Sequence, residues 1–457
     1  MRKKPINKND IIEVEITDLS HQGLGVGHIE SFPIFIENAL PGEHVQAKIN
    51  HVGRRKGHGF MVDLLEKSPH RIEIVDSLHT QNGTMPLQHL AYNEQLKFKQ
   101  RQVKDALSRV AGIKDFPVKE TIGMDHPYGY RNKAQIPVRE IHGKLTTGFY
   151  RKGTHDLIPI EDFVIQAPEI DEVILIVRDI LRKYNLKAYN EDSHSGDIRH
   201  IVVRRGHKTK EIMVVLVTNQ LILQHAKEIV QEIQEAIPEL VSIVQNINTE
   251  KTNVILGKQA MVLYGQDFYE DELLGHRFKI SHRSFYQVNS IQTEKLYQTA
   301  VDYAELTSKE SVVDAYSGIG TMTLALAEKA KKVYGIEIVP AAIADAKMNA
   351  NENKIKNVAF AVADAGEWLV KKVKSGLEID RIVVDPPRKG LSKKFVESVI
   401  QIQVERMVYV SCNPNTMARD IALLIQDGYR LKKVQPVDMF PQTFHIENVA
   451  LLERKNK

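Results

Sequence analysis

The C-terminal part of the chain alternates short apolar segments with longer helical ones, and this pattern restricts the fold most. From residue 276 onward, SVVDAY precedes TMTLALAEKA, KVYGIEI precedes AAIADAKMNANEN and MVYVSC precedes TMARDIALLIQDG; VAFAVAD and RIVVDPP are further apolar segments. Strands that alternate with helices form a parallel, doubly wound sheet, which binds its ligands at the carboxyl ends of the strands. We therefore expect an α/β domain over 276–457 with its site at those ends.

The rest of the chain has a different rhythm, and 457 residues are too many for one ordinary hydrophobic core. Residues 10–66 alternate apolar and polar positions between turns rich in glycine and proline, which predicts a small antiparallel barrel. Residues 67–275 predict an antiparallel sheet, with one strand at NVILG, and a few helices. One helix, at about 92–110, should pack on the C-terminal domain. The predicted domains are thus 1–66, 67–275 and 276–457.

Composition excludes several protein classes. The single cysteine rules out a disulfide framework or a cysteine-ligated metal cage within one chain, and no apolar run approaches the ~18 residues of a membrane-spanning helix. We expect a cytoplasmic protein without a membrane partner. A net charge of +4 permits a nucleic-acid partner but does not require one.

Two basic clusters favour nucleic-acid binding. One is formed by Arg54, Arg55 and Lys56, and the other by Arg204 and Arg205. Phosphate contacts made by such side chains weaken as the salt concentration rises, so the clusters predict salt-sensitive binding. The alternative is that they are solvated turns or charged strand edges that only prevent aggregation.

A glycine loop follows the first strand of the C-terminal domain. In DAYSGIGTMTLALA, Gly318 and Gly320 permit a tight turn before a helix, and the next strand ends at Glu337, where a carboxylate can accept ribose hydroxyls. Together these features favour an adenosine-containing cofactor over simple turn chemistry. The loop ends in Thr321 without a Gly-Lys-Ser/Thr sequence, so no ATP-binding P-loop is expected.

Carboxylates also end the next two apolar segments. VAFAVAD ends at Asp364, placed to meet the adenine edge, and RIVVDPPRKG carries Asp385 in an Asp-Pro-Pro turn. Two prolines fix the backbone at a strand end, so the turn is either a rigid exit or a device that aims the carboxylate into the crevice. We favour the second interpretation.

The only cysteine, Cys412, comes one residue after the apolar strand of VYVSCNP. A lone cysteine is usually a small buried hydrophobe, but the end of a strand is where ligands bind, and a helix N-terminus or a nearby cation would favour its thiolate. No cysteine–histidine pair follows a protease pattern, and His445 is as compatible with a structural role. Glu447 precedes the apolar run NVALL, so burial could raise its pKa and make it a base.

The segments SCNP, DPPRKGL, FYQVN and HIENVALL together resemble the RNA uracil-C5 methyltransferases, which use S-adenosylmethionine, and the resemblance covers nearly the whole chain. It implies a Rossmann-like class I methyltransferase domain, an N-terminal TRAM barrel of the OB-like kind and a mixed α+β central domain that binds RNA. It also implies the site: Cys412 attacks C6 of uracil, Glu447 is the base at C5, Asp385 lies where cofactor and uracil meet, and Phe285 contacts the substrate. The residues matching the family's cofactor pocket are Gln287, Tyr316, Thr321, Glu337, Asp364 and Asp385.

The chemistry requires this set of groups. C5 of uracil is a poor nucleophile until a thiolate adds to C6; the resulting enolate takes the methyl group, and a base must then remove the C5 proton so that the cysteine can leave. The target base must also leave its stack to reach the pocket.

One departure from the family is informative. Many relatives hold an iron–sulfur cluster with four cysteines, whereas this chain has Asp76, Asn82, Met85 and Phe163 at those positions and keeps Gln88 and His89. We expect no iron–sulfur cluster and no other metal. The cluster-free form resembles the 23S rRNA enzymes of Gram-positive bacteria, so 23S rRNA is the expected partner, with no obligate protein partner.

Three alternatives stay open. The same chemistry could act on a tRNA T-loop uridine, because the motifs do not encode which RNA is bound. Asp-Pro-Pro turns also occur in amino-group methyltransferases, so the protein could methylate an amino group. This interpretation leaves Cys412 and Glu447 without a role. A non-catalytic RNA-binding protein with a vestigial pocket is the third.

Overall fold

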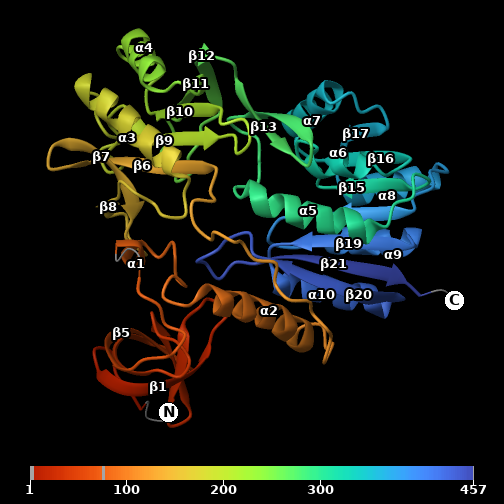
Figure 1. The fold of residues 1–457 in the computed structure, drawn as a ribbon, viewed down its shortest axis with the longest axis horizontal. Coiled ribbons are helices and arrows are strands. Elements are labelled where there is room, and N and C mark those ends of the chain that lie inside the picture. The colour runs from red at the N-terminus through yellow and green to blue at the C-terminus, as the bar shows by residue number, and fades with distance from the viewer. Residues whose placement is uncertain (1–4, 75–77, 456–457) are drawn as a thin grey trace.

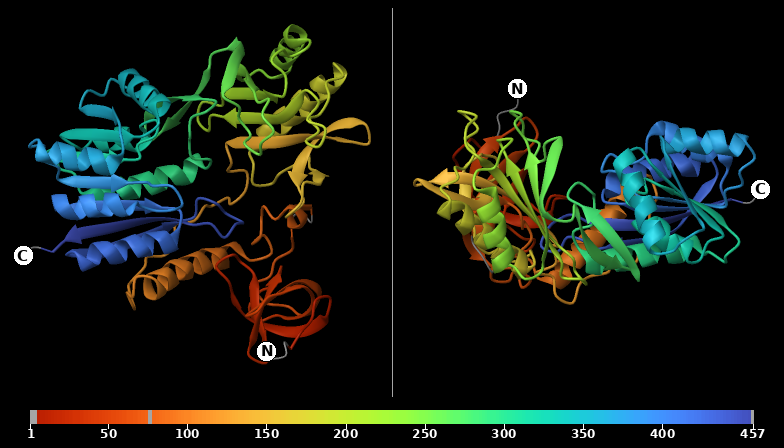
Figure 2. Two further views of the ribbon diagram at one scale, coloured as in Figure 1. Left: turned by 180° about the vertical axis from the view of Figure 1, so that it is seen from behind. Right: turned by 90° about the horizontal axis from the view of Figure 1, so that it is seen from above.

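Figure 1 shows the fold in a computed structural model, which describes residues 5–74 and 78–455. A small barrel at the N-terminal end, a central sheet and a C-terminal sheet follow one another along the chain. The central and C-terminal sheets lie side by side, and the barrel lies at one end of the pair (Figure 2). Among the described residues, none of the helices combines the length and apolar character that a membrane crossing requires.

The N-terminal barrel closes in the strand order β1-β2-β3-β5-β4. Its strands are β1 Ile11–Leu19, β2 Gly25–Ile29, β3 Phe32–Glu37, β4 His44–Val52 and β5 Gly57–Glu66. Alternate side chains, among them Ile16, Ile34 and Val45, fill the interior. The pairings are antiparallel as predicted, except that β3 and β5 run parallel, and this pairing closes the barrel.

An ion pair fixes the barrel to the segment that follows it. Arg71 donates from Nε to Glu43 Oε1 at 2.6 Å and from Nη2 to Glu43 Oε2 at 2.8 Å. Both side chains are buried, and the same guanidinium donates to the carbonyl of Asn38. A short helix, α1 (Leu78–Asn82), lies in this connecting segment.

The central part contains a seven-stranded sheet in the order β12-β11-β10-β9-β6-β7-β8. The strands are β6 Lys133–Ile141, β7 Lys144–Tyr150, β8 Leu157–Pro159, β9 Ile198–Arg205, β10 Ile212–Thr218, β11 Leu240–Ile247 and β12 Gln259–Gly265. Helices α3 (Pro168–Lys183) and α4 (Ala226–Ala236) cover one face through an apolar cluster.

Two expectations for this sheet are wrong. It is not fully antiparallel, because α4 carries the chain from β10 back to the same end and β11 then pairs parallel with β10. The segment 253–257 is not a strand; it belongs to the loop before β12.

The C-terminal sheet has the order β17-β16-β15-β18-β19-β21-β20 and confirms the predicted α/β class. The hairpin β13 (Phe268–Leu273) and β14 (His276–Ser281) precedes it. The strands of the C-terminal sheet and the helices around it are α5 Ser290–Ala304, β15 Ser311–Ala315, α6 Thr321–Ala327, β16 Lys332–Glu337, α7 Pro340–Glu352, β17 Val358–Val362, α8 Ala365–Lys374, β18 Arg381–Val384, α9 Lys393–Ile402, β19 Arg406–Ser411, α10 Pro414–Gln426, β20 Tyr429–Val437 and β21 Glu447–Arg454. The strands from β15 to β19 pair in parallel, and β21 runs antiparallel between β19 and β20. The domain boundaries at 66/67 and 275/276 stay a prediction.

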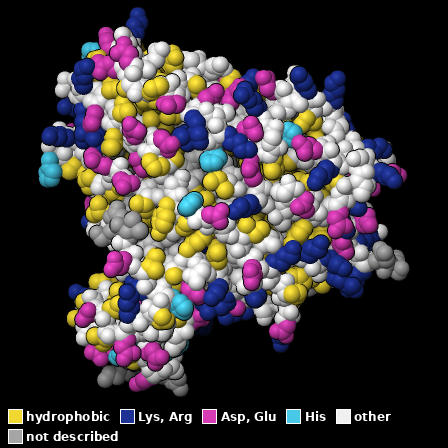
Figure 3. Space-filling model, viewed as in Figure 1, with side chains coloured by type: hydrophobic (Ala, Val, Ile, Leu, Met, Phe, Trp, Pro, Cys, Tyr) yellow, Lys and Arg dark blue, Asp and Glu magenta, His cyan; other side chains and the backbone are white. Residues whose placement is uncertain are grey.

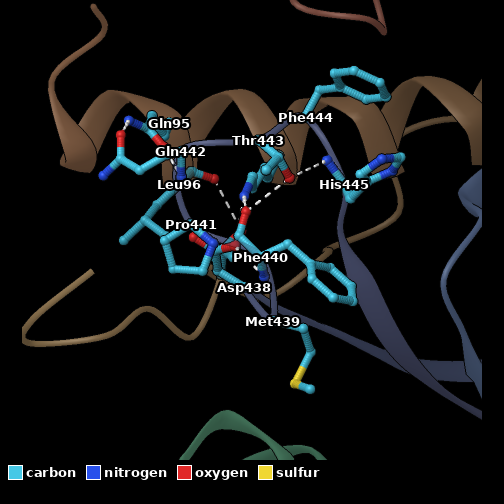
Figure 4. A network of polar contacts seen from close by, with 12 residues as sticks. Gln95, Leu96, Asp438, Met439, Phe440, Pro441, Gln442, Thr443, Phe444 and His445 are labelled. Carbon is cyan, nitrogen blue, oxygen red and sulfur yellow. Dashed lines mark hydrogen bonds and ion pairs between the residues drawn. The ribbon is translucent and has the colours of Figure 1, made fainter. Parts of the chain in front are cut away.

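Helix α2 (Tyr92–Arg109) contributes Val103, Ala106 and Leu107 to the apolar cluster around α10 of the C-terminal domain. Polar contacts then join α2 to the loop between β20 and β21 (Figure 4). Gln95 donates to Gln442 Oε1 at 2.9 Å and accepts from the Gln442 backbone at 3.0 Å. Because this loop leads directly into Glu447, α2 positions one of the predicted site residues.

One of these contacts is a buried ion pair. Lys99 and Asp438 are both fully buried, with 2.5 Å between Nζ and Oδ1, and Lys99 also donates to the carbonyl of Phe440 at 3.0 Å. Burial lowers the pKa of Lys99, whereas Asp438 raises it. The pair therefore depends on both partners being present.

We expect Lys99→Met to lower the free energy of unfolding of the C-terminal domain by about 3–5 kcal/mol, because it leaves a buried carboxylate without its cation. The only tryptophan, Trp368 on α8, allows urea unfolding of this domain to be followed by fluorescence. Lys97→Met is the matched control, because the exposed Lys97–Glu94 pair on the same helix should contribute less than about 1 kcal/mol. If Lys99→Met and Lys97→Met shifted the midpoint of urea unfolding equally, this expectation would be contradicted.

Candidate active site

The predicted catalytic residues meet where β19 and β21 lie next to each other. Val410 pairs with Val449 and Ser411 with Asn448, so the register places Cys412 opposite Glu447. Directly opposed residues of an antiparallel pair have Cβ atoms about 4.5–5.5 Å apart. The cysteine and the glutamate are therefore neighbours, although different elements carry them.

Asp385 lies beside this pair. It follows β18, which is the other neighbour of β19, and its backbone N–H donates to the carbonyl of Ala315 at 3.4 Å. Burial raises the pKa of Asp385 to about 7. Glu447 is 5% exposed, and burial, together with the charge of Asp385, raises its pKa well above the usual range. Two carboxyl groups with raised pKa thus face one thiol.

The electrostatics at Cys412 differ from the sequence expectation. Burial, Glu447 and Asp385 raise the pKa of the thiol to about 11, and Arg388 is the side chain that opposes them. The helix N-terminus of α10 does not compensate, because the Asn413 side chain already accepts from the backbone N–H groups of Asn415 and Thr416. Burial and the two carboxyl groups therefore favour the neutral thiol over the thiolate.

Because Cys412 is the only cysteine, its ionisation can be measured without interference. With a pKa of about 11, roughly one thiol in a thousand is ionised at pH 8. A raised pKa means that the thiolate appears only as the pH rises, so the rate of alkylation by iodoacetamide should still be increasing at pH 10. A rate that is half-maximal near pH 8.5 and levels off by about pH 9.5, as for an ordinary thiol, would show that the site does not raise the pKa of Cys412.

The glycine loop has the backbone geometry of a close approach to a ligand. Tyr316, Gly318 and Gly320 have φ values of 70°, 54° and 88°, which is the left-handed region. A side chain is rare there, so the strain at Tyr316 is typical of a functional loop. A Cβ atom added at Gly318 would meet no atom of the described residues within 4 Å, so the space above Gly318 is open with respect to them.

Glu337 accepts hydrogen bonds from backbone groups of the glycine loop and of the segment after β16. Its Oε2 accepts from the Gly318 N–H at 3.3 Å, and its Oε1 accepts from the N–H groups of Ile338 at 2.8 Å and Val339 at 3.0 Å. The carboxylate is thus held at the end of β16 by backbone groups. Ile338 beside it is 67% exposed, which offers an apolar surface at the same edge.

The remaining predicted cofactor residues take different positions. Gln287 and Thr321 both interact with the hydroxyl of Tyr297, a buried residue of α5. Asp364 is exposed and caps α8 by accepting from the Glu367 N–H at 3.0 Å. Sequence reasoning missed Tyr297, because its position in an apolar helix face carries no sign of a site.

These residues fit S-adenosylmethionine. Ser317 Oγ is buried without a hydrogen-bond partner among the described residues, next to the open space above Gly318. Asp314, at the end of β15, is 1% exposed, and its pKa is raised to about 7 by burial and by the charges of Asp385 and Glu337. Such a group of carboxylates suits a cationic ligand and the hydroxyl donors of a ribose.

A cavity of about 490 Å³ lies between the central and C-terminal parts, and its lining includes Arg388, whose charge acts on Cys412. Arg131 lines it from the segment before β6, Lys133 and Gln135 line it from β6, and Arg388 and His445 line it from the C-terminal part. Burial, together with Arg388 and Lys99, lowers the pKa of His445 to about 4, so this imidazole is neutral near pH 7. Arg388 was not identified from the sequence as a site residue; the charged residue within DPPRKGL was its only signal.

Phe285 and the basic clusters have different exposures. Phe285 is 69% exposed, and Arg54, Arg55 and Lys56 form an exposed turn between β4 and β5. The expectation for Arg204 is wrong: it is 4% exposed and donates to the carbonyls of His282 and Ser284. Figure 3 shows basic and acidic side chains interspersed over the visible face.

Apolar side chains occupy two of the four positions at which the resemblance implies cluster-binding cysteines in other members of the family. Met85 and Phe163 are both buried in one apolar group with Met124, Tyr130 and Ile165. Asn82 Oδ1 accepts from the Thr84 N–H at 2.8 Å. Asp76 lies outside the described residues, and among those described no group of His, Cys, Asp and Glu suits a metal ion.

The fold and the carboxylate-lined glycine loop define a class I methyltransferase domain joined to a small barrel. The family model described as tRNA (Uracil-5-)-methyltransferase matches residues 91–455, and the TRAM domain model matches residues 7–62. The chain therefore belongs to the RNA uracil-5-methyltransferase family, whose enzymes use S-adenosylmethionine.

Relatives and a solved structure agree with this assignment. Proteins named only as RNA methyltransferases from Enterococcus faecalis and Lactiplantibacillus plantarum are 54% and 51% identical, each over 99% of both sequences. The crystal structure of the Pyrococcus abyssi tRNA (uracil-54, C5)-methyltransferase in complex with S-adenosyl-L-homocysteine is 27% identical, has a TM-score of 0.78, and covers 96% of this chain and 99% of its own. The predicted family, fold class and enzyme class are confirmed, as is RNA as the substrate class.

Proposed function

We propose that the protein methylates C5 of uracil in 23S rRNA, with Cys412 as the nucleophile at C6 and Glu447 as the base at C5. The observation that carries the proposal is the register of β19 and β21, which sets the thiol opposite a buried carboxyl group, with Asp385 alongside. The amino-group alternative would use Asp385 but gives this opposed pair no task. A non-catalytic protein would not require the pair at all.

The side chains divide the reaction between them. Cys412 gives its proton to solvent when it adds to C6, and the Arg388 side chain favours its thiolate. Bound S-adenosylmethionine supplies the methyl group as an electrophile. Glu447 then takes the C5 proton as a carboxylate; burial raises its pKa and so makes it a stronger base. Removal of this proton restores the C5–C6 double bond and expels the Cys412 thiolate.

Asp385 and the cofactor residues have supporting roles in this proposal. Asp385 holds the uracil edge, and a pKa of about 7 leaves it able to accept or donate a hydrogen bond near neutral pH. Glu337 and Asp364 would hold the adenosine part of S-adenosylmethionine, and the loop at Tyr316 would hold its methionine part. Gln287 and Thr321 are fixed by Tyr297 at the same end of the sheet.

The cavity between the central and C-terminal parts is the proposed entrance for the target nucleotide. Arg131 and Lys133 offer positive charge to the RNA backbone, and Phe285 is exposed for contact with a base. A uracil must be unstacked to reach Cys412, and a cavity of about 490 Å³ has room for one nucleotide. RNA in a single-stranded loop meets this need at the lowest cost.

The choice of 23S rRNA rests on the cluster-free sequence, in which Met85 and Phe163 replace cysteines and pack together. A tRNA T-loop uridine is the second candidate, because the solved relative from P. abyssi is named for a tRNA uracil. The test is to incubate the purified protein with unmodified transcripts of both RNAs and to digest the products for mass spectrometry. 5-Methyluridine in 23S rRNA fragments is expected; 5-methyluridine in tRNA alone would keep the chemistry and overturn the substrate.

A further inference from the structure

A second cavity lies in the central part of the chain, away from Cys412. It has a volume of about 390 Å³. Its lining includes Arg139 of β6, Tyr150 of β7, Arg199 and His200 of β9, and loop residues around 189–192 and 251–253. The proposed reaction gives this cavity no role.

The side chains of this cavity form a ladder of stacked planar groups. Arg199 lies over the ring of Tyr189, with 4.3 Å to the centroid, and Arg139 lies between Tyr189 and Tyr150, at 5.9 Å and 5.3 Å. His155 stacks on Tyr150 with 5.6 Å between ring centroids and an angle of 29° between planes. The ladder thus ends in an imidazole whose side chain is 61% exposed, and planar groups of this kind are those on which nucleobases stack.

Polar atoms in the wall of the cavity lack partners. Arg199 is 3% exposed, and its Nε has no hydrogen-bond partner among the described residues; the same holds for Nδ1 of His200. Glu191 accepts from Arg139 at 3.3 Å and contacts His155 Nδ1 at 2.7 Å, so it balances part of the positive charge. A wall with both donors and acceptors suits the edge of an uncharged base better than a bare phosphate.

The two cavities share one face of the central sheet. Lys133, Gln135 and Arg139 alternate along β6 and point away from the face that α3 and α4 cover, where Ala134 and Val138 pack. Lys133 and Gln135 line the cavity that Arg388 also lines, and Arg139 lines the second one. At a rise of ~3.3 Å per residue, β6 spans about 20 Å between Lys133 and Arg139, a distance that a few nucleotides cover.

We propose that this second cavity binds an unstacked nucleobase of the substrate RNA, a few nucleotides along the strand from the methylated uridine. The base extends the ladder at His155, and the strand between the two sites follows the β6 face. This inference rests on the proposed function in one respect: the same RNA strand must also reach Cys412. The inference applies equally to 23S rRNA and to tRNA.

The test uses a series of RNA substrates trimmed one nucleotide at a time around whichever uridine the wild type methylates. For the wild type, KM should rise about 10-fold in one step when the bound nucleotide is removed, with kcat unchanged. Tyr150→Ala and His155→Ala should each raise KM about 10-fold on the long RNA and should remove that step from the series. Tyr150→Phe, which keeps the ring, should restore the wild-type profile.

Tyr184→Ala is the matched control. Tyr184 lies at the end of α3 on the other face of the sheet and pairs with His225 at 5.4 Å, so it is also a tyrosine beside a histidine, but it lies outside the cavity. Tyr184→Ala should give the wild-type KM on every RNA of the trimmed series. Identical trimming profiles for the wild type and both cavity variants would overturn the inference.

A filter-binding measurement on the long RNA, made without cofactor, separates this inference from the proposed function. Weaker binding by Tyr150→Ala together with no methylation by the wild type would refute only the function. Unchanged binding by both cavity variants would refute the inference, whatever the activity.

Discussion

Cys412→Ala is expected to abolish methyl transfer to RNA, with a loss of more than about a thousandfold in kcat. Without addition of a thiolate to C6, C5 of uracil stays too weak a nucleophile to take the methyl group, and the chain has no second cysteine to replace the first. The measurement is incorporation of labelled methyl groups from S-adenosylmethionine into RNA. Cys412 is only partly buried, so the smaller side chain should fold normally.

A binding control makes this result specific. Cofactor affinity, measured by calorimetry with S-adenosyl-L-homocysteine, should change less than about threefold, because all the proposed cofactor residues except Asp385 lie on segments that are not next to β19 in the sheet. Near wild-type methyl transfer by Cys412→Ala would remove the cysteine from the mechanism. Loss of both activity and cofactor affinity would assign the cysteine to the cofactor pocket instead.

Glu447→Gln should give a different failure. The amide keeps the size of the side chain but cannot take the C5 proton, so Cys412 would add and the methyl group would transfer, yet the cysteine could not leave. Turnover should fall by about 10²–10⁴, and a covalent complex of protein and methylated RNA should accumulate. The complex would be visible as a slow band on a denaturing gel.

Two comparisons define that result. The double variant Cys412→Ala, Glu447→Gln should give no band, because the link to RNA is through the thiol. Normal turnover by Glu447→Gln would assign the base to another group, of which Asp385 is the nearest candidate. If neither turnover nor a covalent complex were observed, Glu447 would be required at or before the addition of Cys412 to C6.

The fold of the C-terminal domain was predictable because its signal is local. Each strand and helix from SVVDAY to TMARDIALLIQDG is recognisable from its own residues, and the doubly wound order follows from their alternation. The insertion of β21 between β19 and β20 was not predictable, because it is a pairing between segments distant in sequence. That pairing is what brings Glu447 opposite Cys412.

The errors also have physical causes. Arg204 looked like a surface charge, but backbone carbonyls of the segment before α5 satisfy its guanidinium inside the protein. A helix N-terminus was expected to favour the thiolate of Cys412, but Asn413 uses those N–H groups. Burial, together with Glu447 and Asp385, which are distant in sequence but close in space, raises the pKa of the thiol instead. Tyr297 and the ladder at Tyr150 depend on tertiary contacts that no motif records.

The most direct test of the central claim is release of tritium from unmodified 23S rRNA labelled at C5 of uridine, with the purified protein and S-adenosylmethionine. We predict release by the wild type, in proportion to the methyl groups incorporated, and none by Cys412→Ala. Methyl incorporation without release of tritium would contradict the claim, because methylation at C5 must expel the hydrogen that this position carried.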